Sequence, residues 1–298
     1  MAVDRQLPGE RERMDIDLLY FASECGLPIA RLAEAAEQRG FGCLWVPDHS
    51  HIPLATERAL PDEYRHTYDQ FMALTVAAAA TTTLALGTGV TLAAQHDPLH
   101  LAKQVATLDV LSAGRVRFGV GYGWNRPEIA AHNVDPDRRR ARLREHLDAC
   151  RQLWTEDVAS FAGAWTQFGP THAWPKPVQH PHPPIYVGCA PTDRNVELIA
   201  SIGKGWLPID DGRYDVGAGW LRLQEAAERH GRDPSSLEFR VFGLSTRTER
   251  TSRRRIEELR ALGARSVVIH IVNEGGPDDV LRSVDIATAL REEVLADR

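Results

Sequence analysis

The chain has 298 residues, of which 43% are apolar and 26% are charged, and its formal net charge is −6. This composition is typical of a folded protein with a large core and excludes the class of disordered, low-hydrophobicity chains. Charges of both signs are scattered along the chain, so no basic face argues for nucleic acid or an anionic membrane as a partner. A small molecule is the expected partner.

Residues 1–14 are charged and lack an apolar signal segment, and no apolar run approaches the ~18 residues of a membrane span. We therefore expect residues 1–14 to form a flexible extension and the protein to be cytoplasmic. The four cysteines, Cys25, Cys43, Cys150 and Cys189, are far apart. Their spacing argues against a structural zinc site and against a disulfide framework.

From residue 16 onward, short apolar runs rich in β-forming residues alternate with longer segments of helical periodicity, a pattern typical of βα units. Eight runs are expected to be strands, at residues 16–21, 43–46, 84–91, 116–120, 185–187, 205–208, 239–243 and 266–271. Eight alternating units favour a closed barrel over an open doubly wound sheet. We predict α/β architecture, a single (β/α)8 TIM-type barrel over residues 15–298.

Helix signals lie between these strands. One helix is expected to begin at Asp97, a good N-cap, with Pro98 in its first turn. The segment 135–154 has an apolar face opposite a row of arginines, which we interpret as a solvated face in preference to an anion site. Two insertions, near residues 51–68 and 155–184, are expected at the C-terminal face of the strands, where barrels carry their active sites.

The segment 46–53 follows the second expected strand and reads VPDHSHIP. Asp48 and His49 should therefore point into the mouth of the barrel. The spacing of His49 and His51 is also found in metal-dependent barrel hydrolases. Those enzymes need an Asp after the last strand, whereas this chain has VVIHIVNEGG there. A metal site is therefore the weaker interpretation, and His51 could also be an ordinary loop residue.

Three further strand ends are rich in glycine, within segments 86–98, 118–125 and 185–190. Glycine at a strand end marks either a bulge or a place where a flat group approaches the backbone. The third segment precedes an expected helix, whose first amides could bind a phosphate. Each segment alone is equally compatible with an ordinary turn. Together they indicate a phosphorylated cofactor of the flavin type.

These segments resemble, in order, motifs of the luciferase-like monooxygenase superfamily, and specifically of its deazaflavin (F420)-dependent oxidoreductase branch. The resemblance covers nearly the whole chain from Ile16 onward and is carried by GFGCLWVPDHSHIP, LALGTGVTLAAQHDPLHLAKQVATLDVLSAGRVRFGVGYGWN, WPKPVQHPHPPIYVG and IASIGKGWLP. It implies that Asp48 contacts the deazaflavin head and that His49 delivers a proton. It also implies a non-proline cis peptide between Gly89 and Val90 behind the ring.

The other cofactor contacts that the resemblance implies follow the fourth and fifth strands. They are Gly121, Tyr122 and Gly123 along the ring edge and Gly188, Cys189 and Ala190 at the phosphate. Two positions depart from the family pattern. Trp124 lies near the place of a glutamate found in sugar-phosphate dehydrogenases, which makes glucose 6-phosphate a poor candidate substrate. Lys204 replaces the usual aspartate of a later motif.

We therefore expect an F420-dependent oxidoreductase that transfers a hydride between C5 of the deazaflavin and a small organic substrate, with His49 as acid or base. Trp124 and His51 are the expected substrate-pocket residues, with Trp165 and Trp174 as further candidate walls. The alternative is an FMN-dependent monooxygenase. A metal-dependent hydrolase and a cofactor-storing barrel without turnover are weaker alternatives. By analogy with the family, a homodimer is possible.

Overall fold

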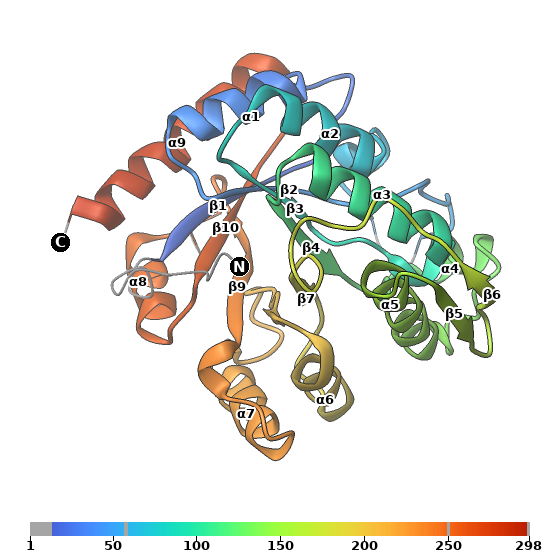
Figure 1. The fold of residues 1–298 in the computed structure, drawn as a ribbon. Helices are drawn as coiled ribbons and strands as arrows, with labels where there is room; N and C mark the ends of the chain where they lie inside the picture. Colours follow the sequence, from blue (N-terminus) through green and yellow to red (C-terminus); the bar gives the residue numbers. More distant parts are fainter. Residues whose placement is uncertain (1–13, 57–58, 249–250, 297–298) are drawn as a thin grey trace.

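The computed structural model describes residues 14–56, 59–248 and 251–296. Eight parallel strands close into a barrel in the order β1-β10-β9-β8-β7-β4-β3-β2, with helices around it (Figure 1). The strands are β1 (Asp15–Tyr20), β2 (Cys43–Val46), β3 (Ala85–Thr88), β4 (Val116–Val120), β7 (Ile185–Val187), β8 (Gly205–Trp206), β9 (Glu238–Ser245) and β10 (Ser266–Ile271). The predicted TIM-type barrel is confirmed. The expected extension lies outside the described residues except for Met14, which is buried.

The predicted third strand is longer than the observed one. β3 ends at Thr88, and the following peptide bond between Gly89 and Val90 is cis. Thr91 then rejoins the sheet through an isolated bridge to Val120. The irregular segment between them lies at the mouth of the barrel.

Helices follow the strands as the sequence predicts. They are α1 (Ile29–Gln38), α2 (Gln70–Ala80), α3 (Pro98–Leu111), α4 (Arg126–Ala131), α5 (Arg139–Thr155), α6 (Asp193–Ile202), α7 (Val216–Arg229), α8 (Arg253–Ala261) and α9 (Pro277–Ala296). Asp97 caps α3 by accepting the N–H of His100, as its sequence position predicts. Among the described residues, no helix is both long enough and apolar enough to cross a bilayer.

The interior of the barrel is filled with side chains. In its lower half, the buried Asp17 carboxylate accepts hydrogen bonds from Ser266 Oγ at 2.7 Å and Trp45 Nε1 at 3.1 Å. Above it, a Cβ on Gly87 would lie 2.3 Å from the ring of Trp45. Gly87 therefore makes room for an indole of the core. Because the barrel is packed below, open space is found at its mouth.

The first insertion lies over that mouth, as expected. Its short 3₁₀ helix η2 (Asp62–Tyr64) brings the buried Glu63 to 3.1 Å from Nε2 of His270 at the end of β10. The ring of Tyr64 packs on Phe21, with 4.6 Å between the ring centroids. These contacts place the insertion against the ends of β1 and β10.

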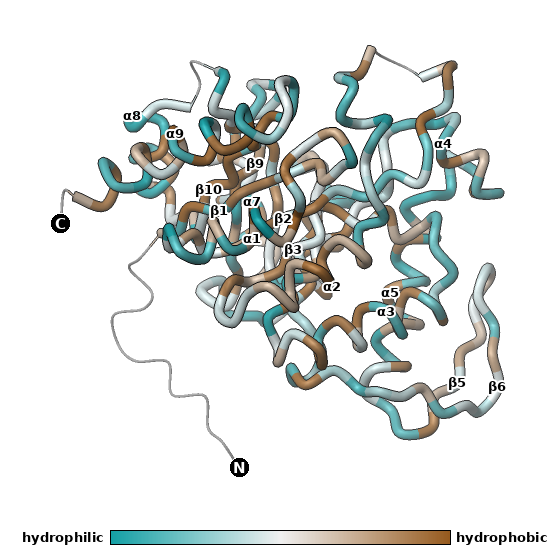
Figure 2. Tube along the Cα trace, turned by 90° about the horizontal axis from the view of Figure 1, so that it is seen from above, coloured by the Kyte–Doolittle hydropathy of each residue, from teal (hydrophilic) through white to brown (hydrophobic). Residues whose placement is uncertain are grey.

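The second insertion is not at the C-terminal face, and that prediction is wrong. It forms an antiparallel hairpin, β5 (Ala159–Ala162) and β6 (Gln167–Thr171), between the end of α5 and the start of β7. A connection from a helix to the next strand returns to the amino-terminal end of a barrel. Figure 2 shows the hairpin and α4 on opposite sides of α5. The carboxylate of Glu145 holds the hairpin by accepting hydrogen bonds from backbone N–H groups, including that of Trp165 at 2.7 Å.

Candidate active site

The main cavity, of about 750 Å³, lies where β3, β4, β7 and β8 end. Its lining includes eight residues that the sequence singles out: Val90, Gly121, Tyr122, Gly123, Trp124, Gly188, Cys189 and Ala190. It also includes residues that sequence reasoning missed: Leu92, Pro191, Thr192, Ile209, Arg213, Tyr214 and Arg222. The barrel therefore brings three glycine-rich strand ends together around one space.

The glycines at these strand ends have specific packing roles. A Cβ on Gly121 would lie 2.7 Å from one methyl of Val90, and a Cβ on Gly188 would lie 2.9 Å from the other. The Val90 side chain thus occupies the room that the two glycines leave. Gly123 has a φ of +79°, in the left-handed region that favours glycine. Gly89 faces the core, where a Cβ would lie 3.1 Å from Cβ of Trp45.

The turn after β7 presents backbone amides to the cavity. The N–H of Gly188 is already used, because it donates to the carbonyl of Val120 at 2.8 Å. Within the described part of the chain, the N–H groups of Cys189 and Ala190 meet no acceptor, and α6 begins just after them. Two of the three predicted phosphate contacts are therefore free to donate. Burial raises the pKa of the Cys189 thiol to about 12, so this cysteine is a neutral thiol.

Tyr122 connects this turn to α5. Asn195 Nδ2 donates to the carbonyl of Ala190 at 2.8 Å and to the Tyr122 hydroxyl at 3.3 Å. The guanidinium of Arg140 lies over the Tyr122 ring, 4.8 Å from its centroid. Tyr122 is thus held from both α5 and α6 at the edge of the cavity.

Asp48 supports the cavity wall and is not among the residues that line the cavity. Its Oδ2 accepts the N–H of Leu92 at 2.8 Å and lies 2.6 Å from Nε2 of His96. Burial opposes ionisation of Asp48, but the hydrogen bond and charge of His96 outweigh it and lower the Asp48 pKa. Burial likewise disfavours the charged form of His96, yet Asp48 raises the His96 pKa above its ordinary value. The pair ties the segment after Val90 to the end of β2.

His49 makes the contact that the sequence did not predict. Its Nδ1 lies 3.0 and 3.1 Å from the two carboxylate oxygens of Glu128 in α4, and both side chains are almost fully buried. The His49 ring also packs against Tyr64 and, with 6.4 Å between ring centroids, against Trp124. Trp124 lines the cavity, and His49 lies beside Trp124. The imidazole is therefore one side chain away from the open space.

His51 lies outside the cavity. Ser50 Oγ is 2.9 Å from Nδ1 of His51 and 2.6 Å from Nε2 of His132, in an exposed cluster. His49 and His51 therefore have different partners and do not converge on one point. Among the described residues, the group with metal-ligand spacing consists of the exposed Glu24, Cys25 and His66, and includes neither His49 nor His51.

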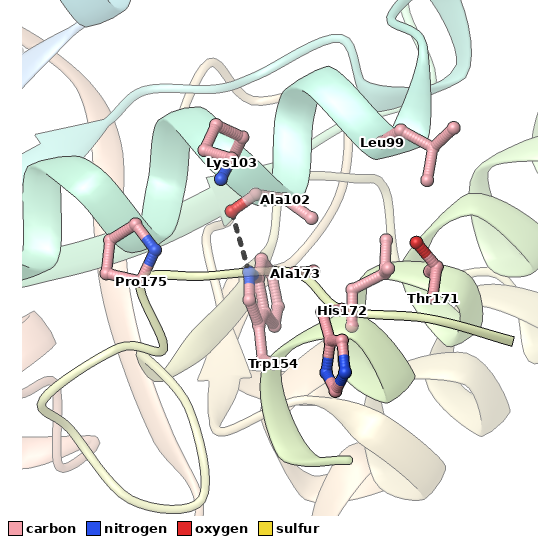
Figure 3. A pocket seen from close by; sticks show the side chains of 9 residues that line it. Leu99, Ala102, Lys103, Trp154, Thr171, His172, Ala173 and Pro175 are labelled. Carbon is pink, nitrogen blue, oxygen red and sulfur yellow. Dashed lines mark hydrogen bonds between the residues drawn. The ribbon is translucent and has the colours of Figure 1, made fainter. Parts of the chain in front are cut away.

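A smaller cavity of about 190 Å³ lies near the hairpin, between α3 and α5 (Figure 3). Trp154 forms one wall and donates its indole N–H to the carbonyl of Ala102 at 2.9 Å. Trp165 and Trp174, which the sequence suggested as walls of the main cavity, are exposed and line neither space. The main cavity is the better candidate for an active site, because strand-end groups converge there.

The profile of the family described as luciferase-like monooxygenase matches residues 28–276. The chain belongs to the luciferase-like monooxygenase family. Members of this family are oxidoreductases, so the chain is an oxidoreductase. The family also agrees with the resemblance seen in the motifs of the sequence. A solved structure of the monooxygenase RslO1 from Streptomyces bottropensis has the same fold, with a TM-score of 0.77, 23% identity, and coverage of 93% of this chain and 98% of that one.

The relatives of this chain include one uncharacterized protein and two enzymes whose names state a cofactor. An uncharacterized protein of Mycobacterium tuberculosis, Rv0953c, is 45% identical over 74% of this chain and 80% of its own length. The F420-dependent hydroxymycolic acid dehydrogenase of the same species is 29% identical over 69% of this chain and 55% of its own length. The FMNH2-dependent dimethylsulfone monooxygenase of Pseudomonas putida is 37% identical over 30% of this chain and 26% of its own length.

Proposed function

We propose that the protein is an F420-dependent oxidoreductase that reduces or oxidises a small organic substrate at the mouth of the barrel. The proposal rests on one arrangement in the structure. The cavity lies between the free backbone amides of Cys189 and Ala190 and the buried imidazole–carboxylate pair of His49 and Glu128. A relative named as F420-dependent aligns over 69% of the chain, whereas one named as FMNH2-dependent aligns over 30%. A relative named as 4-hydroxyprotoasukamycin monooxygenase aligns over 70% of the chain, so coverage does not separate the two classes, and the preference for F420 rests on the motifs that resemble the F420-dependent branch.

The donors around the cavity suit an anionic, ring-bearing cofactor. The free N–H groups of Cys189 and Ala190 lie just before the start of α6, where the helix dipole favours a phosphate. Arg213 and Arg222 line the same cavity, where each is paired with an aspartate, Asp211 and Asp193 respectively. Val90 gives the cavity a flat apolar support for a ring. These residues would hold the cofactor, which when bound supplies the hydride chemistry at its C5.

His49 is the proposed acid or base. Glu128 engages its Nδ1, and among the described residues its Nε2 has no hydrogen-bond partner. A carboxylate at Nδ1 favours the tautomer that carries its proton on Nδ1 and a lone pair on Nε2. Nε2 is then the nitrogen that can exchange a proton with the substrate. Trp124, next to His49 and on the cavity wall, would orient the substrate and exclude water.

An FMN-dependent monooxygenase is the second candidate, and the names of the Pseudomonas relative and of RslO1 support it. Titration of the purified protein with F420 and with FMN, followed by cofactor fluorescence, separates the two proposals. We expect F420 to bind at least about tenfold more tightly than FMN, which is about 1.4 kcal/mol. Tighter binding of FMN would favour the monooxygenase, and binding of neither would refute both proposals.

A further inference from the structure

A second large hollow adjoins the main cavity on the side of the Cys189 and Ala190 amides, where the cofactor phosphate is proposed to bind. It has a volume of about 1120 Å³ and runs between the start of α5 and the start of α6. We call it the basic groove and define it by five of its arginines: Arg138, Arg139, Arg140, Arg144 and Arg194. In the sequence, the arginines of α5 suggest only a solvated helix face.

The basic groove is positively charged in a chain whose net charge is −6. Its lining also contains Arg126 and three acidic residues, and each acid already has a cation beside it. Asp137 pairs with Arg126 at 2.9 Å, and Asp193 pairs with Arg222 of the main cavity. Glu197 pairs with Arg229 at 2.7 Å.

Most of the arginines that define the groove lack such a neutralising partner. Arg138 and Arg194 are exposed, and within the described ranges neither lies within ion-pair distance of a carboxylate. Arg140 is exposed and contacts the Tyr122 ring. Arg144 is different, because it pairs with Asp148 on its own helix at 2.8 Å. At least three cations therefore remain available to an anionic ligand.

The basic groove lies next to the main cavity, because residues that line one contact residues that line the other. Tyr122 lines the cavity, while the Arg140 guanidinium that covers its ring lines the groove. Asn195 lines the groove and binds the carbonyl of Ala190, in the amide turn. A chain that extends from the amide turn past Asn195 and Arg140 would therefore reach the groove.

We propose that the basic groove binds a chain of carboxylates that extends from the cofactor beyond its phosphate. This inference rests on the proposed function, because F420 carries such an oligoglutamate chain and FMN ends at its phosphate. Several exposed cations attract a polyanion mainly through charge, so the interaction is weakened by salt. The groove therefore adds affinity for the tail and gives the protein a preference for long-tailed F420.

The test measures binding and needs no substrate. Wild-type protein is titrated with long-tailed F420, short-tailed F420 and the deazaflavin precursor that lacks both phosphate and tail, at low and high salt. Each exposed ion pair contributes modestly, so a few of them together give about tenfold tighter binding of the long tail at low salt. We expect this difference to shrink to about twofold at high salt.

A charge-reversed variant and a matched control locate the effect. Arg138→Glu with Arg194→Glu should remove the tail-length difference, whereas binding of the tail-less precursor should stay within about twofold of wild type. The control is Arg254→Glu, on α8, whose side chain is 89% exposed and far from the groove in the chain. It should leave all affinities unchanged.

Equal wild-type affinities for long and short tails, with F420 still bound, would overturn the inference and leave the cofactor proposal intact. An unchanged tail preference in the double variant would also overturn it. Failure of every deazaflavin to bind would refute the cofactor proposal as well. The wild-type comparison requires no substitution, so the inference stays testable even if the double variant does not fold.

Discussion

Replacing Glu128 with glutamine tests whether this carboxylate sets the proton position on His49. Both carboxylate oxygens lie within 3.1 Å of Nδ1, and the Glu128 side chain is 1% exposed. Glutamine keeps the shape but offers one acceptor and one donor, so both tautomers of His49 become possible. A hydrogen bond to a charged group is worth about 1.5–3 kcal/mol, so we expect turnover to fall about tenfold to about hundredfold.

Two assays follow this substitution. Nitrogen NMR of labelled protein reports the His49 tautomer directly, and we expect one tautomer in wild type and a mixture in the Glu128→Gln variant. Reoxidation of reduced cofactor by added carbonyl acceptors reports turnover. The matched control is Glu63→Gln, because Glu63 is also buried and pairs with a histidine, His270, at 3.1 Å.

A variant that retains the wild-type tautomer and turnover would refute this positioning role of Glu128. Loss of turnover together with loss of the folded state would point to a structural role instead, and thermal unfolding of the same samples separates the two. An equal loss of turnover in the Glu63→Gln control would show that any buried carboxylate at the barrel mouth has the same effect.

Three further substitutions test other parts of the site. His49→Ala should lower turnover at least about tenfold while F420 affinity, measured by fluorescence, stays nearly constant. Because Asp48 raises the pKa of His96 above its ordinary 6.5, the pair stabilises the fold fully below pH 6.5 and loses this contribution as the pH rises through the raised pKa. Urea midpoints should fall over that pH range in wild type and not in His96→Gln. Gly121→Ala places a Cβ 2.7 Å from a valine methyl and should cost about 1–3 kcal/mol of unfolding free energy, whereas Gly169→Ala, with nothing within 4 Å, should have little effect.

The barrel could be predicted from the sequence because each strand is a separate local signal. Eight apolar runs and the helices between them do not depend on how distant segments meet. Helix caps such as Asp97 are equally local. The position of the second insertion was misjudged because length and composition do not say which end of the barrel an insertion extends, whereas its place between α5 and β7 does.

Glu128 could not be found from the sequence because its role depends on docking of α4 against the end of β2. It stands 79 residues from His49 in the chain, in the first turn of a short helix where a glutamate is ordinarily explained by the helix dipole. Its near-complete burial is the property that distinguishes it, and burial of a charged residue is visible only in the fold. Arg213 and Arg222 were missed for a related reason, because they reach the cavity from the segments after β8 and only the fold brings those segments to it.

The residues that the motifs pointed to serve the fold as well as the candidate site, and this affects how the site must be tested. Gly188 gives its amide to the sheet, Asp48 braces the segment after Val90, and Gly121 accommodates the Val90 side chain. A substitution at any of them can abolish cofactor binding by moving the wall of the cavity. Cofactor affinity therefore has to be measured together with unfolding free energy, and only a loss of affinity without a loss of stability assigns a residue to cofactor binding.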